Sequence, residues 1–299
     1  MKRRKYNKKR REAVTGHLFL LPSNILAVLF LIYPLFYAVY LSLTKFNGFK
    51  APQYIGYENY ANLLKDPYFG VSLTNVLIYV AIVVPALMIL GLILAATLAN
   101  RFRNRFGEFV RVTSFIPTLC SLALMGTVFF FVFSSDSQSV MNSLMKLLNL
   151  PKQNWLGSPR TAMLVICFVT IWKSIGYYIV YFYAGIMDIP KDYYEAARLD
   201  GASNVQQFIH ITLPCLKPVL YLVLLLLTIS SFQVFELPYT MTHGGPGNAT
   251  TMPGYLIYSF AFKSGKMGYA SAYAIVIGII IFIISILERV VLREKVGEE

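Results

Sequence analysis

The chain consists of long runs of apolar residues separated by short clusters of charged residues. Residues 13–44 and 67–100 contain no Asp, Glu, Lys or Arg, and the segment 161–187 is interrupted by Lys173 alone. About 20 apolar residues cross a bilayer as a helix, and runs without strict alternation argue against a membrane barrel. The pattern predicts an all-α integral membrane protein with about six transmembrane helices, near residues 17–44, 71–99, 112–133, 161–187, 215–237 and 269–287.

The Lys and Arg residues between these runs predict the orientation of the chain. Residues 1–16 hold eight of them, and with the amino end inside, 18 basic residues lie on the cytoplasmic side against eight outside. Cytoplasmic loops carry the excess of Lys and Arg, so both termini are placed in the cytoplasm. We therefore expect a basic cytoplasmic segment (1–16), a transmembrane domain (17–293) and a cytoplasmic tail (294–299).

Composition and charge support a membrane protein and exclude other classes. Charged residues make up 14% of the chain, against about 25% in soluble domains. The net charge of +13 lies mostly at the ends of apolar segments, so the bilayer explains it and no nucleic-acid partner is expected. Three cysteines without C-x-x-C spacing and three scattered histidines predict neither a metal site nor a membrane enzyme.

The most informative polar segment is the loop 188–214, between the fourth and fifth predicted spans. Pro190 fits the first turn of a helix, where its missing N–H costs nothing, and Gly201 fits the left-handed position that ends a helix. Ser203 and Gln206 have the spacing of a capping box, which starts a new helix. The loop is therefore predicted to form a helix, a glycine turn and a second short helix.

The first predicted helix of this loop carries a face suited to contact with another protein. Tyr193, Ala196, Ala197 and Asp200 fall on one side of it by helical spacing, and the two alanines let another surface come close. Glu195 stands beside this face, where it can pair with a cation. We expect the face to be a docking surface.

The same loop resembles the EAA signature of the membrane subunits of bacterial ATP-binding-cassette (ABC) importers, with seven positions matched at fixed spacing. The resemblance implies the type I importer permease fold, a bacterial cell-membrane location, and two coupling helices seated in a cytoplasmic ATPase dimer. It also implies a second homologous permease subunit and an extracytoplasmic solute-binding protein. The residues implied in ATPase coupling are Glu195, Ala196, Ala197, Asp200, Gly201, Ile211, Leu213 and Pro214.

The chain lacks the phosphate-binding sequence G-x-x-x-x-G-K-[ST]. Gly265-Lys266 has Phe260 in place of the earlier glycine and is followed by Met267. The chain is therefore not expected to be its own ATPase, and we expect no cofactor on it. ATP and Mg²⁺ would be bound by the partner ATPase.

Three further segments resemble the carbohydrate-uptake subgroup of these permeases, and within it the MalF-like or UgpA-like kind. They are residues 17–49, 172–176 and 241–262. The implied cargo is a sugar or oligosaccharide, and a non-sugar solute such as glycerol phosphate is the alternative. Residues 243–248 form a Gly/Pro turn signal, which the resemblance places outside, facing the solute-binding protein.

Polar and aromatic side chains within the spans are the candidates for cargo contact. An ionisable group inside a membrane is costly and by default a functional hypothesis, and sugar sites combine aromatic faces with hydrogen-bonding groups. Each candidate also has a structural alternative: Lys173 can pair with Glu236, amides can bond neighbouring helices, and tyrosines can form the aromatic belt. The predicted substrate-pathway residues are Asn75, Trp172, Lys173, Tyr177, Tyr178, Gln233, Glu236 and Tyr239.

An ion-coupled secondary transporter is the competing class of function. Such a protein is expected to contain paired inverted repeats and intramembrane acids. The chain shows no convincing internal repeat, and Glu236 is the only acid expected near a span. The sequence therefore favours the ABC permease.

Overall fold

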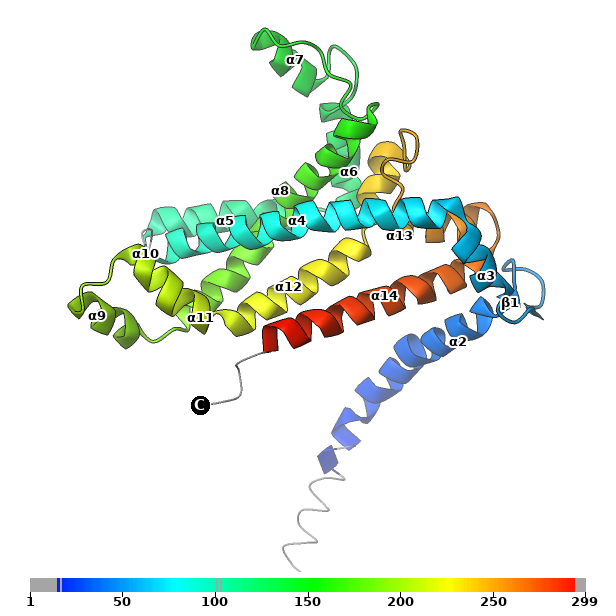
Figure 1. The fold of residues 1–299 in the computed structure, drawn as a ribbon, viewed down its shortest axis with the longest axis horizontal. Coiled ribbons are helices and arrows are strands. Elements are labelled where there is room, and N and C mark those ends of the chain that lie inside the picture. Colours follow the sequence, from blue (N-terminus) through cyan, green and yellow to red (C-terminus); the bar gives the residue numbers. More distant parts are fainter. Residues whose placement is uncertain (1–14, 17, 101, 103, 294–299) are drawn as a thin grey trace, which may run out of the picture. The chain divides into compact units, whose positions relative to one another are not determined.

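The computed structural model describes residues 15–16, 18–100, 102 and 104–293, and nearly all of its regular structure is helical (Figure 1). The prediction of an all-α chain is confirmed, since the two strands have two residues each. The elements, with η marking a π-helix, are η1 (Val28–Ile32), α2 (Tyr33–Ser42), β1 (Thr44–Lys45), β2 (Gln53–Tyr54), α3 (Glu58–Lys65), α4 (Pro67–Asn100), α5 (Arg105–Leu119), α6 (Leu122–Val132), α7 (Val140–Leu147), α8 (Pro159–Met187), α9 (Lys191–Leu199), α10 (Asn204–Gln207), η2 (Phe208–Thr212), α11 (Leu213–Cys215), α12 (Lys217–Phe232), η3 (Pro238–Thr242), α13 (Pro253–Tyr258), η4 (Ser259–Lys263) and α14 (Met267–Arg293).

Six segments of the described chain match the predicted membrane crossings. Four are single helices of 25 to 34 residues, and two are pairs of helices bent by 96° and 69° at a short break. By length and composition they give four spans, or six if each bent pair is one span. The segments are Leu18–Ser42, Pro67–Asn100, Arg105–Leu119 with Leu122–Val132, Pro159–Met187, Asn204–Cys215 with Lys217–Phe232, and Met267–Val291.

The third span, predicted near 112–133, is bent close to Pro117, one of the prolines at which the sequence allows a kink. α5 ends at Leu119, and Cys120 and Ser121 have extended backbone angles before α6 begins. Pro117 lies in the last turn of α5, where it lacks the N–H that the helix would use. The two half-helices then diverge by 96°.

The fifth span differs from its predicted range, 215–237, at both ends. It bends by 69° at the break before α12. In an unbroken helix the ring of Pro218, which lies in the first turn of α12, would clash with the carbonyl group four residues earlier. α12 already ends at Phe232, and the chain becomes helical again only at Glu236. The predicted range near 215–237 therefore contains α12, a short break and the first residues of the next helical segment.

The last span is longer than the predicted 269–287 and contains an acid. α14 continues to Arg293, so Glu288 lies inside the helix. The Thr228 hydroxyl of α12 donates to Glu288 Oε1 at 2.6 Å. Glu288 therefore joins two spans, and the expectation that Glu236 is the only acid near a span is wrong.

The chain divides into two compact units, and the first comprises residues 1–65 and 259–275. Its strands β1 and β2 pair antiparallel in the loop after the first span. The Asn59 side chain of α3 is buried and donates to the carbonyl oxygens of Ser42 (2.8 Å) and Thr44 (2.9 Å). One amide therefore holds this loop against the end of α2.

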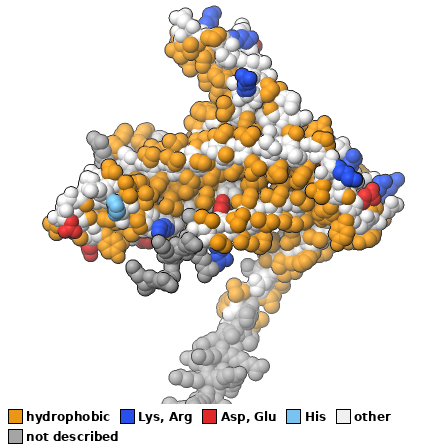
Figure 2. Space-filling view, viewed as in Figure 1, with side chains coloured by type: hydrophobic (Ala, Val, Ile, Leu, Met, Phe, Trp, Pro, Cys, Tyr) orange, Lys and Arg blue, Asp and Glu red, His pale blue; other side chains and the backbone are white. Residues whose placement is uncertain are grey.

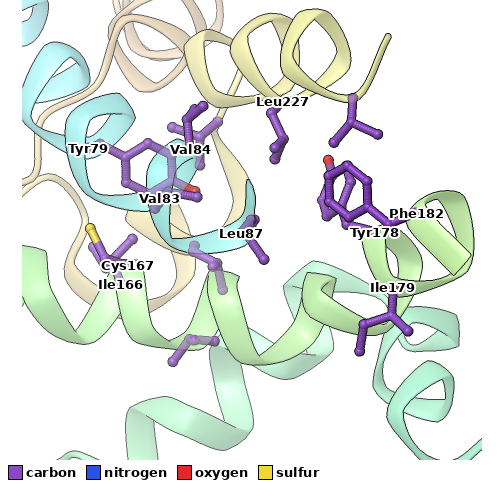
Figure 3. Close-up of a cluster of buried hydrophobic side chains, with 14 of the residues drawn as sticks. Tyr79, Val83, Val84, Leu87, Ile166, Cys167, Tyr178, Ile179, Phe182 and Leu227 are labelled. Carbon is purple, nitrogen blue, oxygen red and sulfur yellow. The ribbon is translucent and has the colours of Figure 1, made fainter. Parts of the chain in front are cut away.

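The second unit comprises residues 66–258 and 276–299, and its core lies where α4, α8 and α12 pack together (Figure 3). Gly91 of α4 lets the ring of Phe182 approach, because a Cβ there would lie 3.2 Å from the ring. Branched and aromatic side chains fill the space between these helices, and they include Tyr79, Val83, Leu87, Ile166, Ile179, Phe182 and Leu227.

α5 crosses α8 at very short range. A Cβ on Gly176 of α8 would overlap the backbone carbonyl group of Ser114. Beside this crossing, the Thr118 hydroxyl donates to the carbonyl oxygen of Lys173 at 3.0 Å. The glycine and the threonine together fix the depth and rotation of α8 against α5.

Many large apolar side chains of the described residues are exposed. Figure 2 shows hydrophobic side chains over most of the face that it draws. In the first span, only 11% of the most apolar window is buried within the chain. Lipid tails are as apolar as these side chains, so their exposure costs little in a bilayer.

The loop between α6 and α8 has a polar centre in place of an apolar core. The Asn142 side chain is 3% exposed and donates to the carbonyl oxygens of Asp136 (2.9 Å) and Gln153 (3.1 Å). Its own oxygen accepts from the Trp155 indole N–H at 3.1 Å. As with Asn59, a single buried amide organises an outer loop.

Candidate functional site

The loop 188–214 has the predicted order of helix, glycine turn and helix. α9 ends before Gly201, which has a φ of +80°. The Ala202 N–H then donates to the Ala197 carbonyl group at 2.8 Å, which satisfies the open end of α9. The capping box of Ser203 and Gln206 is confirmed. Pro190 lies one residue before the first turn, not within it.

Hydrogen bonds join the two helices of this loop into one unit. The hydroxyl groups of Tyr194 on α9 and Thr212 on η2 lie 2.9 Å apart. Gln207 of α10 is buried and donates to the Ala202 carbonyl group at 2.9 Å. The Tyr194–Thr212 contact therefore connects α9 to the helical segment that leads into α12.

The eight residues predicted to take part in ATPase coupling differ in their exposure to solvent. Five are exposed, and the other three, Ala197, Ile211 and Leu213, are half-buried. Ile211 packs against the core, so it anchors the loop. Leu199 and Val205 are exposed apolar residues that the sequence pattern did not single out. The exposed motif residues are Glu195, Ala196, Asp200, Gly201 and Pro214.

A hollow of about 650 Å³ lies between the end of α8 and the two helices of the loop. Glu195, Arg198 and Asn204 line it together with the buried Gln207. The lining of the hollow combines both signs of charge with apolar residues such as Met187 and Phe208. This surface has the chemistry of a protein docking site.

A second cavity, of about 410 Å³, opens among α4, α8 and the end of α12, close to the break in the third span. Five predicted substrate-pathway residues line it together. Lys173, Tyr177 and Tyr178 come from α8, Gln233 comes from the break after α12, and Glu236 is the first helical residue after that break. The break therefore brings an amide and a carboxylate to the same cavity as a lysine and two tyrosines.

Three predicted residues do not line this cavity. Trp172 packs edge-on against Phe129, with ring centroids 5.2 Å apart. Tyr239 stacks on Phe235 at 5.3 Å. Asn75 donates its amide to backbone carbonyl groups of an outer loop, as described below. For Asn75, the structural alternative holds in place of direct cargo contact.

Lys173 is not paired with Glu236. Among the described residues, no carboxylate oxygen lies within 4.0 Å of the Lys173 ammonium group. The cavity thus contains one positive and one negative side chain, both of which can bond to a guest.

Several hydroxyl groups in the cavity were not predicted. Thr170 lies one turn before Ser174 on α8 and accepts a hydrogen bond from the Tyr79 hydroxyl at 2.9 Å. Such groups are hard to recognise from sequence, because Ser and Thr in apolar helices commonly bond to their own helix, as Thr170 does to Ile166. Their helical spacing with Lys173 and Tyr177 is the signal that could have found them. The unpredicted hydroxyl residues are Tyr79, Thr118, Thr170, Ser174, Ser230 and Ser231.

Comparison with known proteins gives the family. The family model described as "Binding-protein-dependent transport system inner membrane component" matches residues 87–295, which is most of the chain. The chain belongs to this family. It is therefore a multi-pass membrane permease, and the predicted class of protein is confirmed.

Similar curated proteins are permeases along nearly their whole length. A probable ABC transporter permease, YurN of Bacillus subtilis, is 37% identical and aligns over 92% of this chain and 94% of its own. The sulfoquinovosyl glycerol permease SmoG of Agrobacterium fabrum is 35% identical (87% and 84%). The arabinooligosaccharide permease AraP of Bacillus subtilis is 33% identical (91% and 86%).

A solved structure shares the fold. A chain of a bacterial ABC transporter involved in the import of the acidic polysaccharide alginate superposes with a TM-score of 0.84. The alignment covers 98% of this chain and 100% of that chain, at 22% sequence identity. The prediction of an ABC importer permease fold is confirmed.

Proposed function

We propose that this permease carries a sugar or oligosaccharide into the cell, driven by ATP that a separate subunit hydrolyses. The cavity between α4, α8 and α12 carries the proposal, because it offers tyrosine rings, hydroxyl groups, an amide and two unpaired charges to one guest. Relatives named for arabinooligosaccharides and sulfoquinovosyl glycerol support a carbohydrate cargo.

The proposed assembly has four kinds of component. A cytoplasmic ABC ATPase dimer docks on residues 188–214 and binds ATP and Mg²⁺, and this chain binds neither. A second homologous permease completes the pathway, and an extracytoplasmic solute-binding protein delivers the cargo. The exposed and rigid α9 unit supports the first of these contacts, and the family description supports the last.

Glu195→Arg is expected to weaken ATPase binding about tenfold, because a hydrogen-bonded charge contributes roughly 1.5–3 kcal/mol and about 1.4 kcal/mol is a factor of ten. Asp192→Arg reverses a charge on the same exposed helix and is the control. The measurement is co-purification with the ATPase and uptake into vesicles.

Measurements of uptake also distinguish an ABC permease from an ion-coupled secondary transporter. Accumulation should stop when ATP is depleted and the ion gradients are kept. Continued accumulation would favour an ion-coupled transporter. In the co-purification experiment, unchanged ATPase binding by Glu195→Arg would show that Glu195 does not contribute to the docking surface.

Lys173→Ala is expected to raise the KM for cargo about tenfold, because it removes a charged donor from the cavity. Co-purification with the ATPase should not change, since Lys173 lies far along α8 from the loop 188–214. Lys50→Ala removes an exposed lysine from an outer loop as the control. Glycerol phosphate serves as a competitor for the non-sugar alternative. An unchanged KM would assign Lys173 a structural role.

A further inference from the structure

The outer wall of the cavity is part of one continuous segment, residues 236–252, which follows the break after α12. Its first two residues, Glu236 and Leu237, line the cavity. Most residues of its middle part, from Met241 to Pro246, line a second groove of about 450 Å³ beside the end of α6 and the loop that precedes α8. A short stretch of chain therefore borders both spaces.

Internal hydrogen bonds make this segment a single body. The N–H of Gly244 donates to the carbonyl group of Pro238 (3.3 Å), and the N–H of Thr250 donates to that of Gly244 (3.2 Å). The hydroxyl groups of Thr242 and Thr250 are 2.6 Å apart, and the Thr251 hydroxyl donates to the Gly244 carbonyl group at 2.9 Å. Thr250 and Thr251 are buried, so water does not compete for these bonds.

Asn75 ties this body to α4. Its amide donates to the carbonyl oxygens of Asn248 (2.8 Å) and Thr251 (2.9 Å). The side chain is 8% exposed. It lies one helical turn before Tyr79, which lines the cavity from α4. Asn75 is therefore a link between the α4 side of the cavity and the body 236–252.

We propose that Asn75 is a positioning residue that latches the body 236–252 over the cavity, and that cargo enters when this latch opens. The inference rests on the proposed transport function. Neutral amide–carbonyl bonds suit a latch, because each has a modest net free energy and water can replace it. Since the body carries Glu236 into the cavity wall, its release opens the cavity towards the outside.

The test measures access to the cavity from outside. Ser230→Cys places a thiol in the cavity lining, and a membrane-impermeant maleimide is added to the assembled transporter. Asn75→Ala is expected to raise the labelling rate several-fold. An unchanged rate overturns the proposal. The background lacks the native thiols, through substitution of Cys120, Cys167 and Cys215.

Asn59 provides the matched control, because its amide also donates to two backbone carbonyl groups and is equally buried. It ties the loop after the first span and does not line the cavity. Asn59→Ala is expected to leave the labelling rate of the Ser230→Cys thiol unchanged. A similar acceleration in both variants would mean general loosening of the protein and would overturn the latch.

A disulfide tests the same motion by putting a covalent link in place of the Asn75 hydrogen bonds. Asn75→Cys with Thr251→Cys is expected to cross-link α4 to the body 236–252, blocking both labelling and uptake until a reductant is added. Full uptake by the oxidised protein would contradict the proposal. The labelling rate needs no cargo, so failure of the latch is distinguishable from failure of the proposed function, which the ATP-depletion experiment tests.

Discussion

Gly176→Ala is expected to lower the free energy of unfolding by about 3 kcal/mol, the upper end of overpacking effects. The added methyl group would overlap the backbone carbonyl group of Ser114, and backbone cannot rotate away as a side chain can. α5 and α8 would have to separate, which also breaks the bond from Thr118 to the Lys173 carbonyl group. The measurement is denaturant-induced unfolding of the purified protein in detergent.

Gly278→Ala is the matched control for this prediction. Gly278 also lies within a long apolar helix, but a Cβ there meets no atom within 4 Å. Alanine favours helix over glycine by about 1 kcal/mol, so this variant should be as stable as the parent or slightly more stable. Equal stability of the two variants would show that the crossing at Gly176 is looser than described.

Gly201→Val is expected to reduce ATP-dependent uptake about tenfold while the protein remains folded in the membrane. The φ of +80° costs a non-glycine residue roughly 1–2 kcal/mol, and about 1.4 kcal/mol is a factor of ten. No atom lies within 4 Å of an added Cβ, so the effect comes from backbone conformation. The relaxed turn would change the angle between α9 and α10. The measurement is uptake and ATPase binding at matched expression.

Two control variants sharpen this expectation. Gly201→Asn should retain most of the uptake, because asparagine tolerates the left-handed region. Gly56→Val places the same strain at a φ of +61° with open space around it, in a loop outside the membrane. It should leave ATPase binding intact. A loss of ATPase binding in Gly56→Val would mean that the effect of Gly201→Val is not local.

The spans were predictable from sequence because their apolar runs are long, whereas a proline such as Pro117 showed only where a bend was possible. The runs give the bounds of the first, second and fourth spans to within a few residues. The breaks at Cys120 and Leu216 depend on Pro117 and Pro218, and proline acts differently in each context. Pro85 lies inside α4, for example, and the helix continues through it.

The residues that line the cavity were predictable only in part. Residue type indicates which side chains can bind a guest, but it does not indicate which way each side chain points. Lys173 and Gln233 line the cavity as predicted. The partners of Asn75 lie 173 and 176 residues further along the chain, so its role depends on tertiary structure. The direction of the Trp172 side chain also depends on tertiary structure. It is next to Lys173 in the sequence, but its ring packs against Phe129 and does not line the cavity.

The interruption of the third span brings the start of α6 to the cavity. Thr118 and Leu122, on the two sides of the interruption, both line this space, and Ser121 makes no side-chain bond to cap the start of α6. The first N–H groups of a helix lack partners within it. Hydroxylated guests can use such groups whatever side chains surround them. If the cavity binds the cargo as proposed, replacement of lining residues is expected to change which guest is preferred more than whether a hydroxylated guest binds.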